Sequence, residues 1–131
     1  MEKIKVELAQ LKDLSIVKIL LTDTARWLNS KGSTQWAGLL KGEDVHNIED
    51  AISRQEVFLA YRFNKIVGIF TLWSEQSIWD KDLWGEDNSK EFFYLHRLAL
   101  ATTEHGKGTG RILIDKAKNI ALLENKKGLR L

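Results

Sequence analysis

With 131 residues, of which 44% are hydrophobic and 29% charged, the chain is long enough to form one domain with its own core. Its 20 basic and 18 acidic residues leave a net charge of +2, too little to attract nucleic acid or an anionic membrane. The absence of cysteine excludes disulfides and thiolate metal sites and suits a reducing compartment. No stretch resembles a signal peptide or approaches the ~20 apolar residues of a membrane span. We therefore expect a cytoplasmic protein that binds neither nucleic acid nor a membrane.

The first part of the chain predicts one strand followed by two helices. Residues 4–8 alternate apolar and charged side chains, which is the period of a half-buried strand. Asp13 can cap a helix whose apolar residues recur at helical spacing and which ends near Gly32. After a loop over residues 38–42, a second helix with a narrow apolar stripe is expected at residues 43–52.

The middle of the chain predicts a β-hairpin and then a polar loop. Residues 57–63 form the first strand, residues 64–65 the two-residue turn, and residues 66–73 the return strand. Gly68 inside the return strand indicates a bulge or a close approach of another backbone. Residues 75–90 are expected to form a polar loop.

The last part of the chain predicts a strand, a glycine-rich loop, a helix and the start of another strand. Residues 92–100 are apolar on both faces, which indicates a central strand. The helix after the loop has Leu113, Ala117, Ile120 and Ala121 at helical spacing, and residues 126–128 supply its C-terminal stop. Residues 129–131 begin a further strand.

The loop at residues 104–111 has the chemistry of an anion site. It contains three glycines in alternation with Lys107 and Thr109, and glycine lets a ligand approach the backbone amides closely. The first turn of the following helix has N–H groups without an intrahelical partner and a partial positive charge. Lys107 and Arg111 add formal charge, so phosphate or pyrophosphate is the expected guest. An ordinary glycine-rich turn is the alternative.

The spacing of the glycines excludes two common phosphate motifs. A dinucleotide-binding loop requires G-x-G-x-x-G, but Arg111 stands three residues after Gly108. A Walker loop requires G-x-x-x-x-G-K-[ST], but the Gly106-Lys107 pair is followed by another glycine. What remains resembles the acetyl-CoA signature of the GNAT superfamily of N-acetyltransferases, Q/R-x-x-G-x-G/A. Residues 105–110 occupy these positions, with a histidine where the family usually has Gln or Arg.

This resemblance covers nearly the whole chain. The expected order of strand, two helices, three strands, helix and strand matches the GNAT fold, an α/β (α+β) domain with a mixed, mostly antiparallel sheet flanked by helices. Residues 27–36 (WLNSKGSTQW), 94–99 (YLHRLA) and 129–131 are similar to an uncharacterised Bacillus-type branch. The resemblance implies one acetyl-CoA-binding domain over residues 1–131. It also implies that this domain stops in its fifth strand, before further elements that carry the tyrosine acting on the leaving thiolate.

The resemblance also implies the activity and the cofactor site. Family members transfer the acetyl group of acetyl-CoA to an amine, of a small molecule or a protein, by direct attack on the thioester. A non-catalytic or truncated CoA-binding module is the alternative. In the family, the strand before the loop holds the pantetheine arm and polarises the thioester carbonyl, and the loop holds the pyrophosphate. The residues implied in these roles are Leu98, Ala99, Leu100, His105, Gly106, Lys107, Gly108, Thr109, Gly110 and Arg111.

The incoming ammonium must lose a proton before it attacks, which requires a base or a chain of water molecules. His96 is the first candidate, because its position on the strand resembles that of histidines in serotonin-type acetyltransferases and imidazole titrates near neutral pH. The alternative is a histidine that is only packed in the strand. Glu91 and Asp80 are weaker candidates, since each is expected to be a solvated surface acid.

Five tryptophans are many for this length, and an aromatic site for a cationic or flat amine is one interpretation. Trp36, Trp79 and Trp84 are the candidates for substrate binding, whereas Trp27 and Trp73 are expected in core or rim packing. The three scattered histidines predict no metal site, and His46 is expected to be exposed. An unpaired sheet edge could bring two copies together as a homodimer.

Overall fold

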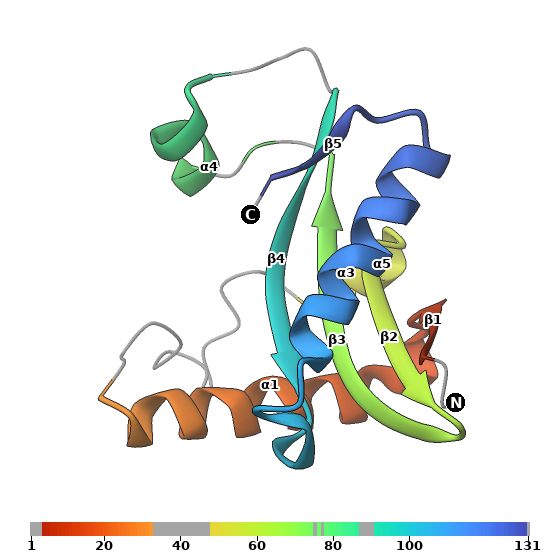
Figure 1. Cartoon of the computed structure of the whole chain (residues 1–131), viewed down its shortest axis with the longest axis vertical. Helices are drawn as coiled ribbons and strands as arrows, with labels where there is room; N and C mark the ends of the chain where they lie inside the picture. The colour runs from red at the N-terminus through yellow and green to blue at the C-terminus, as the bar shows by residue number, and fades with distance from the viewer. Residues whose placement is uncertain (1–3, 33–47, 75, 77, 87–90, 131) are drawn as a thin grey trace.

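The computed structural model describes residues 4–32, 48–74, 76, 78–86 and 91–130 (Figure 1). The expected second helix is described only as α3, and the loop expected at residues 38–42, together with His46, lies outside the described residues. The elements in chain order are β1 (Ile4–Leu8), η1 (Leu11–Asp13), α1 (Leu14–Ser30), α3 (Ile48–Ser53), β2 (Val57–Arg62), β3 (Lys65–Trp73), α4 (Ile78–Trp84), β4 (Phe92–Leu100), η2 (Thr102–Glu104), α5 (Thr109–Leu123) and β5 (Gly128–Arg130).

The five strands form one sheet in the order β1-β2-β3-β4-β5. The first three pairings are antiparallel, and β4 pairs with β5 in parallel. The predicted mixed, mostly antiparallel sheet is therefore confirmed, and β4 lies between two neighbours as its apolar pattern indicated. In Figure 1, α5 covers one face of the sheet, whereas α1 and α3 lie behind the other face.

The core has two halves, one on each face of the sheet. Alternate residues of one strand enter different halves: Leu59 of β2 packs with α1 and α3, whereas Ala60 packs with α5. The same alternation in β3 places Ile69 on one side and Phe70 on the other. This burial on both faces explains the continuous apolar runs of the central strands. None of the described helices is long and apolar enough to cross a membrane.

One predicted helix cap and one predicted turn differ from the observed ones. Asp13 stands at the N-cap of α1, but its carboxylate makes no cap bond there; it accepts the Gln10 amide at 2.9 Å. The hairpin turn was predicted one residue too late. Arg62 pairs with Lys65, so the turn residues are 63–64, and Phe63 has a φ of 57° and a 75% exposed side chain. Hydrophobicity predicted Phe63 in the strand, whereas the register of the pairing places it in the turn.

Both expectations for Gly68, a bulge and a close approach of another backbone, are confirmed. The register shifts at the neighbouring Ala60/Tyr61 step, and Gly68 faces Leu100 of β4. A Cβ on Gly68 would lie 2.7 Å from Cδ1 of Leu113 and 2.8 Å from the carbonyl oxygen of Ala99. Because backbone and a packed side chain block this space, glycine is what allows α5 to sit this close to the sheet.

The stretch predicted as a polar loop contains a helix, α4 (Ile78–Trp84). Its composition is mostly polar, but Asp80 within it is only 1% exposed. The prediction of a loop over the whole of residues 75–90 is therefore wrong. A buried carboxylate fixes this segment against the sheet, which a reading of hydrophobic periodicity does not detect.

Candidate active site

The loop between β4 and α5 passes twice through the left-handed region of backbone space. Gly106 and Gly108 have φ angles of 78° and 79°, and nothing lies within 4 Å of the position that a Cβ would take on either residue. Glycine is favoured here because other residues are strained at such angles. Gly110 differs, since it lies inside α5 without a positive φ. Two of the three glycines therefore shape the turn and leave its backbone open to a ligand.

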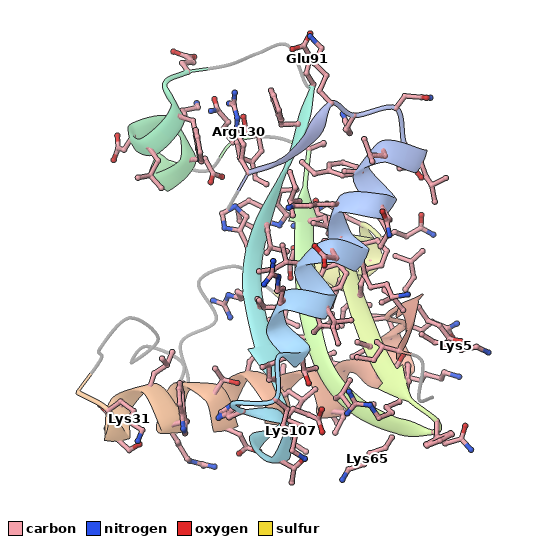
Figure 2. The ribbon with its side chains drawn as sticks, viewed as in Figure 1. Lys5, Lys31, Lys65, Glu91, Lys107 and Arg130 are labelled. Carbon is pink, nitrogen blue, oxygen red and sulfur yellow. The ribbon has the colours of Figure 1, made fainter. Side chains whose placement is uncertain are left out.

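The start of α5 presents amides and cations together. Its N-cap is Gly108, and no side chain makes a cap hydrogen bond there. The amides of the first helical turn have no acceptor within the helix and carry the positive end of its dipole. Lys107 and Arg111 are exposed beside them. Figure 2 shows Lys107 extending from the loop at the end of β4. This arrangement has the geometry and charge that a phosphate group requires.

A buried carboxylate lies directly behind the loop. Glu104 is 5% exposed, and its Oε1 accepts hydrogen bonds from Arg62 at 2.5 Å and from the hydroxyl of Thr109 at 2.9 Å. Burial by itself would raise the pKa of Glu104. The hydrogen bonds from Arg62 and Thr109, with the charges of Arg62 and Lys107, outweigh burial and hold this pKa below its ordinary value. Glu104 is therefore a carboxylate at neutral pH.

His105 packs against α1. Its ring lies edge-on to Trp27, with 4.4 Å between the ring centroids. Trp27 is 39% exposed, which fits the expected rim packing. The residue that replaces the usual Gln or Arg of the signature thus connects the loop to the first helix.

The strand before the loop carries a bulge. Thr71 pairs with His96 and Ile69 pairs with Ala99, so β4 contains one more residue than β3 between these pairs. Arg97 in the bulge has a φ of 51°, which is uncommon for a residue with a side chain. Among the described residues, β5 pairs only with residues 92–94 of β4. The segment at residues 98–100, predicted to hold the pantetheine arm, begins in this bulge and lies beyond the pairing with β5.

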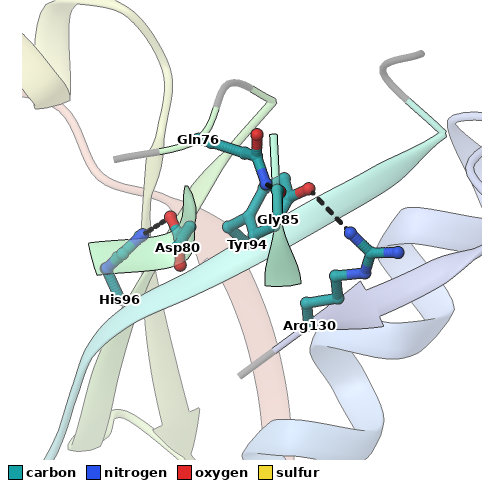
Figure 3. A network of polar contacts seen from close by, with 6 residues as sticks. All are labelled: Gln76, Asp80, Gly85, Tyr94, His96 and Arg130. Atoms are coloured by element: carbon teal, nitrogen blue, oxygen red, sulfur yellow. Dashed lines mark hydrogen bonds and ion pairs between the residues drawn. The ribbon is translucent and has the colours of Figure 1, made fainter. Parts of the chain in front are cut away.

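His96 forms an ion-pair-type hydrogen bond that the sequence did not predict. Its Nε2 lies 2.9 Å from Oδ2 of Asp80, and the two side chains are 15% and 2% exposed (Figure 3). The ring of Trp73 covers His96, with 4.3 Å between centroids. Asp80 was expected to be a solvated surface acid, and this is wrong. Its carboxylate is buried because it faces the imidazole.

A pocket lies beside this pair, on the face of the sheet that α1 and α3 cover. Most of its wall is aliphatic, with the imidazole, a threonine and an arginine at the strand side. The lining residues are Val17, Leu21, Ile48, Ala51, Val57, Ile69, Thr71, Trp73, His96 and Arg97. Its free space is about 20 Å³, room for about one water molecule, so it is a small gap in the core beside the imidazole.

The remaining predicted site residues lie away from this pocket or outside the described part of the chain. Glu91 pairs with Lys127 at 3.1 Å, and Figure 2 shows it at the end of the sheet opposite Lys107. Trp84 is 48% exposed and lies 5.2 Å from the guanidinium of Arg130. Trp36 and the side chain of Trp79 are outside the described residues.

Arg130 lies among three aromatic rings. Its guanidinium lies 4.0 Å from the centroid of Phe92 and 5.9 Å from that of Tyr94, and it donates to the Tyr94 hydroxyl at 3.2 Å (Figure 3). With Trp84, these contacts connect α4 to β4 and β5. Trp84 therefore meets a cation of the chain itself, whereas the prediction assigned it to a bound amine.

Three polar residues of the site were missed or misjudged. Arg62 is 42 residues from Glu104, so no local pattern connects them. Glu104 stands directly before the glycine loop, and this position was the one available signal. Asp80 had no signal, because its partner lies 16 residues further along. Within the described residues, no group of three or more His, Asp or Glu is placed to hold a metal ion.

Known proteins share both this fold and much of this sequence. The uncharacterised N-acetyltransferase YesJ of Bacillus subtilis (strain 168) is 37% identical over 120 residues, which are 92% of the chain and 67% of YesJ. The crystal structure of a GNAT-family acetyltransferase from Listeria monocytogenes 4b F2365 is 35% identical with a TM-score of 0.76. That match covers 92% of the chain and 71% of the Listeria protein.

A more distant structure shares the fold alone. The PaiA N-acetyltransferase of Thermoplasma acidophilum, in complex with coenzyme A, has a TM-score of 0.65 at 14% identity. The match covers 93% of the chain and 74% of that protein. No protein-family model matches the sequence.

Proposed function

The chain belongs to the GNAT family of N-acetyltransferases, and on this basis we propose that it transfers the acetyl group of acetyl-CoA to an amine by direct attack on the thioester. The observation that carries this proposal is the open glycine turn at the uncapped start of α5. This turn follows the strand that bears His96 and its buried partner. The anion site and a candidate base therefore lie on one continuous segment.

The residues of the loop fit the cosubstrate. Gly106 and Gly108 give an unobstructed backbone, and Lys107 and Arg111 supply charge for a pyrophosphate. His105 and Thr109 would set the position of the loop through their contacts with α1 and Glu104. Acetyl-CoA would supply the activated acetyl group.

The strand segment at residues 98–100 would hold the pantetheine arm next to the loop. Its pairing partners are on the β3 side, where Ala99 faces Ile69 and Leu100 faces Gly68. The bulge at Arg97 changes the direction of the backbone groups just before this segment. An amide near Leu98 would polarise the thioester carbonyl and stabilise the charge that develops on its oxygen.

His96 would act as the base that removes a proton from the attacking amine. Asp80 lies 2.9 Å from its Nε2 and would hold the ring in place during proton transfer. A carboxylate on one ring nitrogen orients the imidazole and stabilises the charged form that appears when the proton arrives. The neutral amine then attacks the carbonyl carbon, the C–S bond breaks, and CoA leaves as the thiolate, which takes up through solvent the second proton that the amine nitrogen loses.

Trp36, Trp79 and Trp84 stay predictions for acceptor contacts, and Glu91 stays a weaker candidate base. The single-domain assignment over residues 1–131 is likewise a prediction.

The test is release of CoA thiol when the protein is mixed with acetyl-CoA and a panel of amines that differ in apolar character. Mass spectrometry identifies the acetylated product. Direct attack requires a ternary complex, so initial rates at varied concentrations of both substrates should give intersecting reciprocal plots. Parallel plots would indicate an acetylated enzyme instead. Binding of acetyl-CoA without turnover of any amine would contradict the proposed activity and favour a CoA-binding module.

A further inference from the structure

The carboxylate of Glu104, behind the glycine loop, has no role in the acetyl-transfer steps proposed above. Glu104 lies on η2, at the start of the loop, and is buried next to a site that is suited to an anion. A negative charge in this position would by itself repel a phosphate. The structure compensates it, because the Arg62 guanidinium lies 2.5 Å away and is 21% exposed. The pair therefore adds little net charge to the site, and its contribution must be geometric.

Both hydrogen bonds meet at the same oxygen. Oε1 of Glu104 accepts from Arg62, which ends β2, and from Thr109, which is the first residue of α5. Thr109 is fully buried, so its hydroxyl has a fixed position. One carboxylate thus connects the edge of the hairpin, the beginning of the loop and the first turn of the helix.

The residues between Glu104 and Thr109 are those of the loop itself. Gly106 and Gly108 stand in this interval with positive φ, and their conformational freedom makes an unsupported loop variable. Anchoring both ends through one oxygen restricts the loop and the direction of the amides at the start of α5. Preorganised donors bind an anion more strongly than mobile ones, because less ordering entropy is lost on binding.

We propose that Glu104 is a positioning residue for the pyrophosphate loop, which it holds in its binding geometry through Thr109 and Arg62. This rests on the proposed function, since it assigns the loop to the pyrophosphate of acetyl-CoA. Glu104 touches neither the acetyl group nor the acceptor. Its effect is therefore confined to ligands that carry the pyrophosphate.

The test compares two ligands by titration calorimetry. Acetyl-CoA has the pyrophosphate, whereas S-acetylpantetheine has the same thioester and arm without it. In Glu104→Gln, a neutral acceptor replaces the carboxylate at nearly constant shape. Because a hydrogen bond to a charged group is worth about 1.5–3 kcal/mol, we expect at least about tenfold weaker binding of acetyl-CoA. Binding of S-acetylpantetheine should not change. In turnover, the KM for acetyl-CoA should rise while kcat stays constant.

A second pair of variants keeps the test independent of the folding of Glu104→Gln. Thr109→Val preserves the buried shape but removes the hydroxyl, and should weaken acetyl-CoA binding about fivefold. Thr109→Ser retains the hydroxyl and should restore binding. The matched control is Glu56→Gln, which breaks a pair with Arg54 at 3.1 Å away from the loop and should leave both affinities unchanged.

Unchanged acetyl-CoA affinity in Glu104→Gln or in Thr109→Val would overturn the proposal. An equal loss for both ligands would also overturn it, because it would indicate general damage to the fold. These outcomes differ from a failure of the proposed function, in which the unaltered protein itself would not bind acetyl-CoA.

Discussion

Two buried carboxylates, Asp80 and Glu104, stand in opposite relation to their partners. Asp80 is 1% exposed and faces the imidazole of His96, a group that can take up and release a proton during a reaction. Glu104 is 5% exposed and faces the guanidinium of Arg62, whose charge is permanent. The first pair borders a pocket, whereas the second lies behind a loop.

The two carboxylates are therefore expected to have different roles in the site. A carboxylate next to an imidazole suits proton transfer, because it stabilises the positive charge of the ring while the ring holds the transferred proton. A carboxylate next to a permanent cation suits anchoring, since the pair stays charged at all working pH values. Changes at the first pair should therefore alter kcat, and changes around the second should alter cosubstrate binding or stability. The following variants test that division.

The largest expected effect is that of His96→Ala. Loss of a general base costs about 10²–10⁴-fold, so we expect kcat to fall by at least about 100-fold. The Kd for acetyl-CoA should stay within about twofold, because His96 lies outside the loop and the loss of one distant contact is worth a few tenths of a kcal/mol. Thiol-release assays measure kcat, and calorimetry measures the Kd for acetyl-CoA. The pH–rate profile of kcat should lose one limb. A kcat and profile like those of the unaltered protein would exclude His96 as the base.

Gly68→Ala should have the largest effect on stability. The added Cβ would lie 2.7 Å from Leu113 and 2.8 Å from the Ala99 carbonyl, and overpacking of this kind costs about 1–3 kcal/mol. Thermal or urea unfolding measures the change. The control is Gly128→Ala, where the nearest atoms, of Phe92, lie at an ordinary 3.7 Å. Equal stability of the two variants would contradict the close packing of α5 on the sheet.

Asp80→Asn should reduce kcat less than loss of the imidazole does. The amide keeps the shape of the buried carboxylate but provides no charge to stabilise a protonated His96. We expect about a tenfold fall in kcat, the size of one charge-assisted hydrogen bond, with an unchanged KM for acetyl-CoA. Steady-state kinetics at several pH values provide the measurement. A rise in the KM for acetyl-CoA with constant kcat would remove the proposed distinction between the two carboxylates.

The smallest expected effect is a change in acid stability at Glu104. Because its folded-state pKa lies below its ordinary value of 4.5, the ionised side chain stabilises the fold at neutral pH. This contribution is lost as the pH falls from 4.5 through the lowered pKa. The difference in unfolding free energy between the unaltered protein and Glu104→Gln should therefore be about 1–2 kcal/mol at pH 7 and shrink below pH 4.5. Urea unfolding at pH 7 and pH 3 checks this, and a constant difference would contradict an ionised Glu104.

Most of the fold could be read from the chain because local patterns specified it. Strict alternation predicted β1, and the apolar run at residues 92–100 predicted the central strand β4 with the bounds that the structure has. Glycine and periodicity predicted α5, although the helix ends at Leu123, before the stop expected at residues 126–128. The predictions for Phe63 and for the α4 segment were wrong because contacts distant in sequence decided both against their hydrophobicity. The pairing register decided the place of Phe63, and a single buried polar contact decided α4.

The candidate site likewise has a part that the sequence predicted and a part that it did not. The loop and its cations were predictable because they are contiguous, and their spacing resembles the GNAT signature. The His96–Asp80 and Arg62–Glu104 pairs were not, because their members are 16 and 42 residues apart. Distance in sequence carries no information about which carboxylate meets which base or cation.

The sequence by itself determined the strands, the helices and a glycine turn before a helix, since these depend on periodicity and on backbone freedom, and its resemblance to the GNAT family implied the mixed sheet and the cosubstrate. Tertiary structure alone decided that Asp80, which was expected to be a surface acid, and Glu104, at the start of the loop, are both buried. Burial of a carboxylate becomes affordable only when the fold brings a partner within hydrogen-bond distance. The same folding step selects Asp80 for the imidazole and Glu104 for the loop, and so assigns to each acid its part in the site.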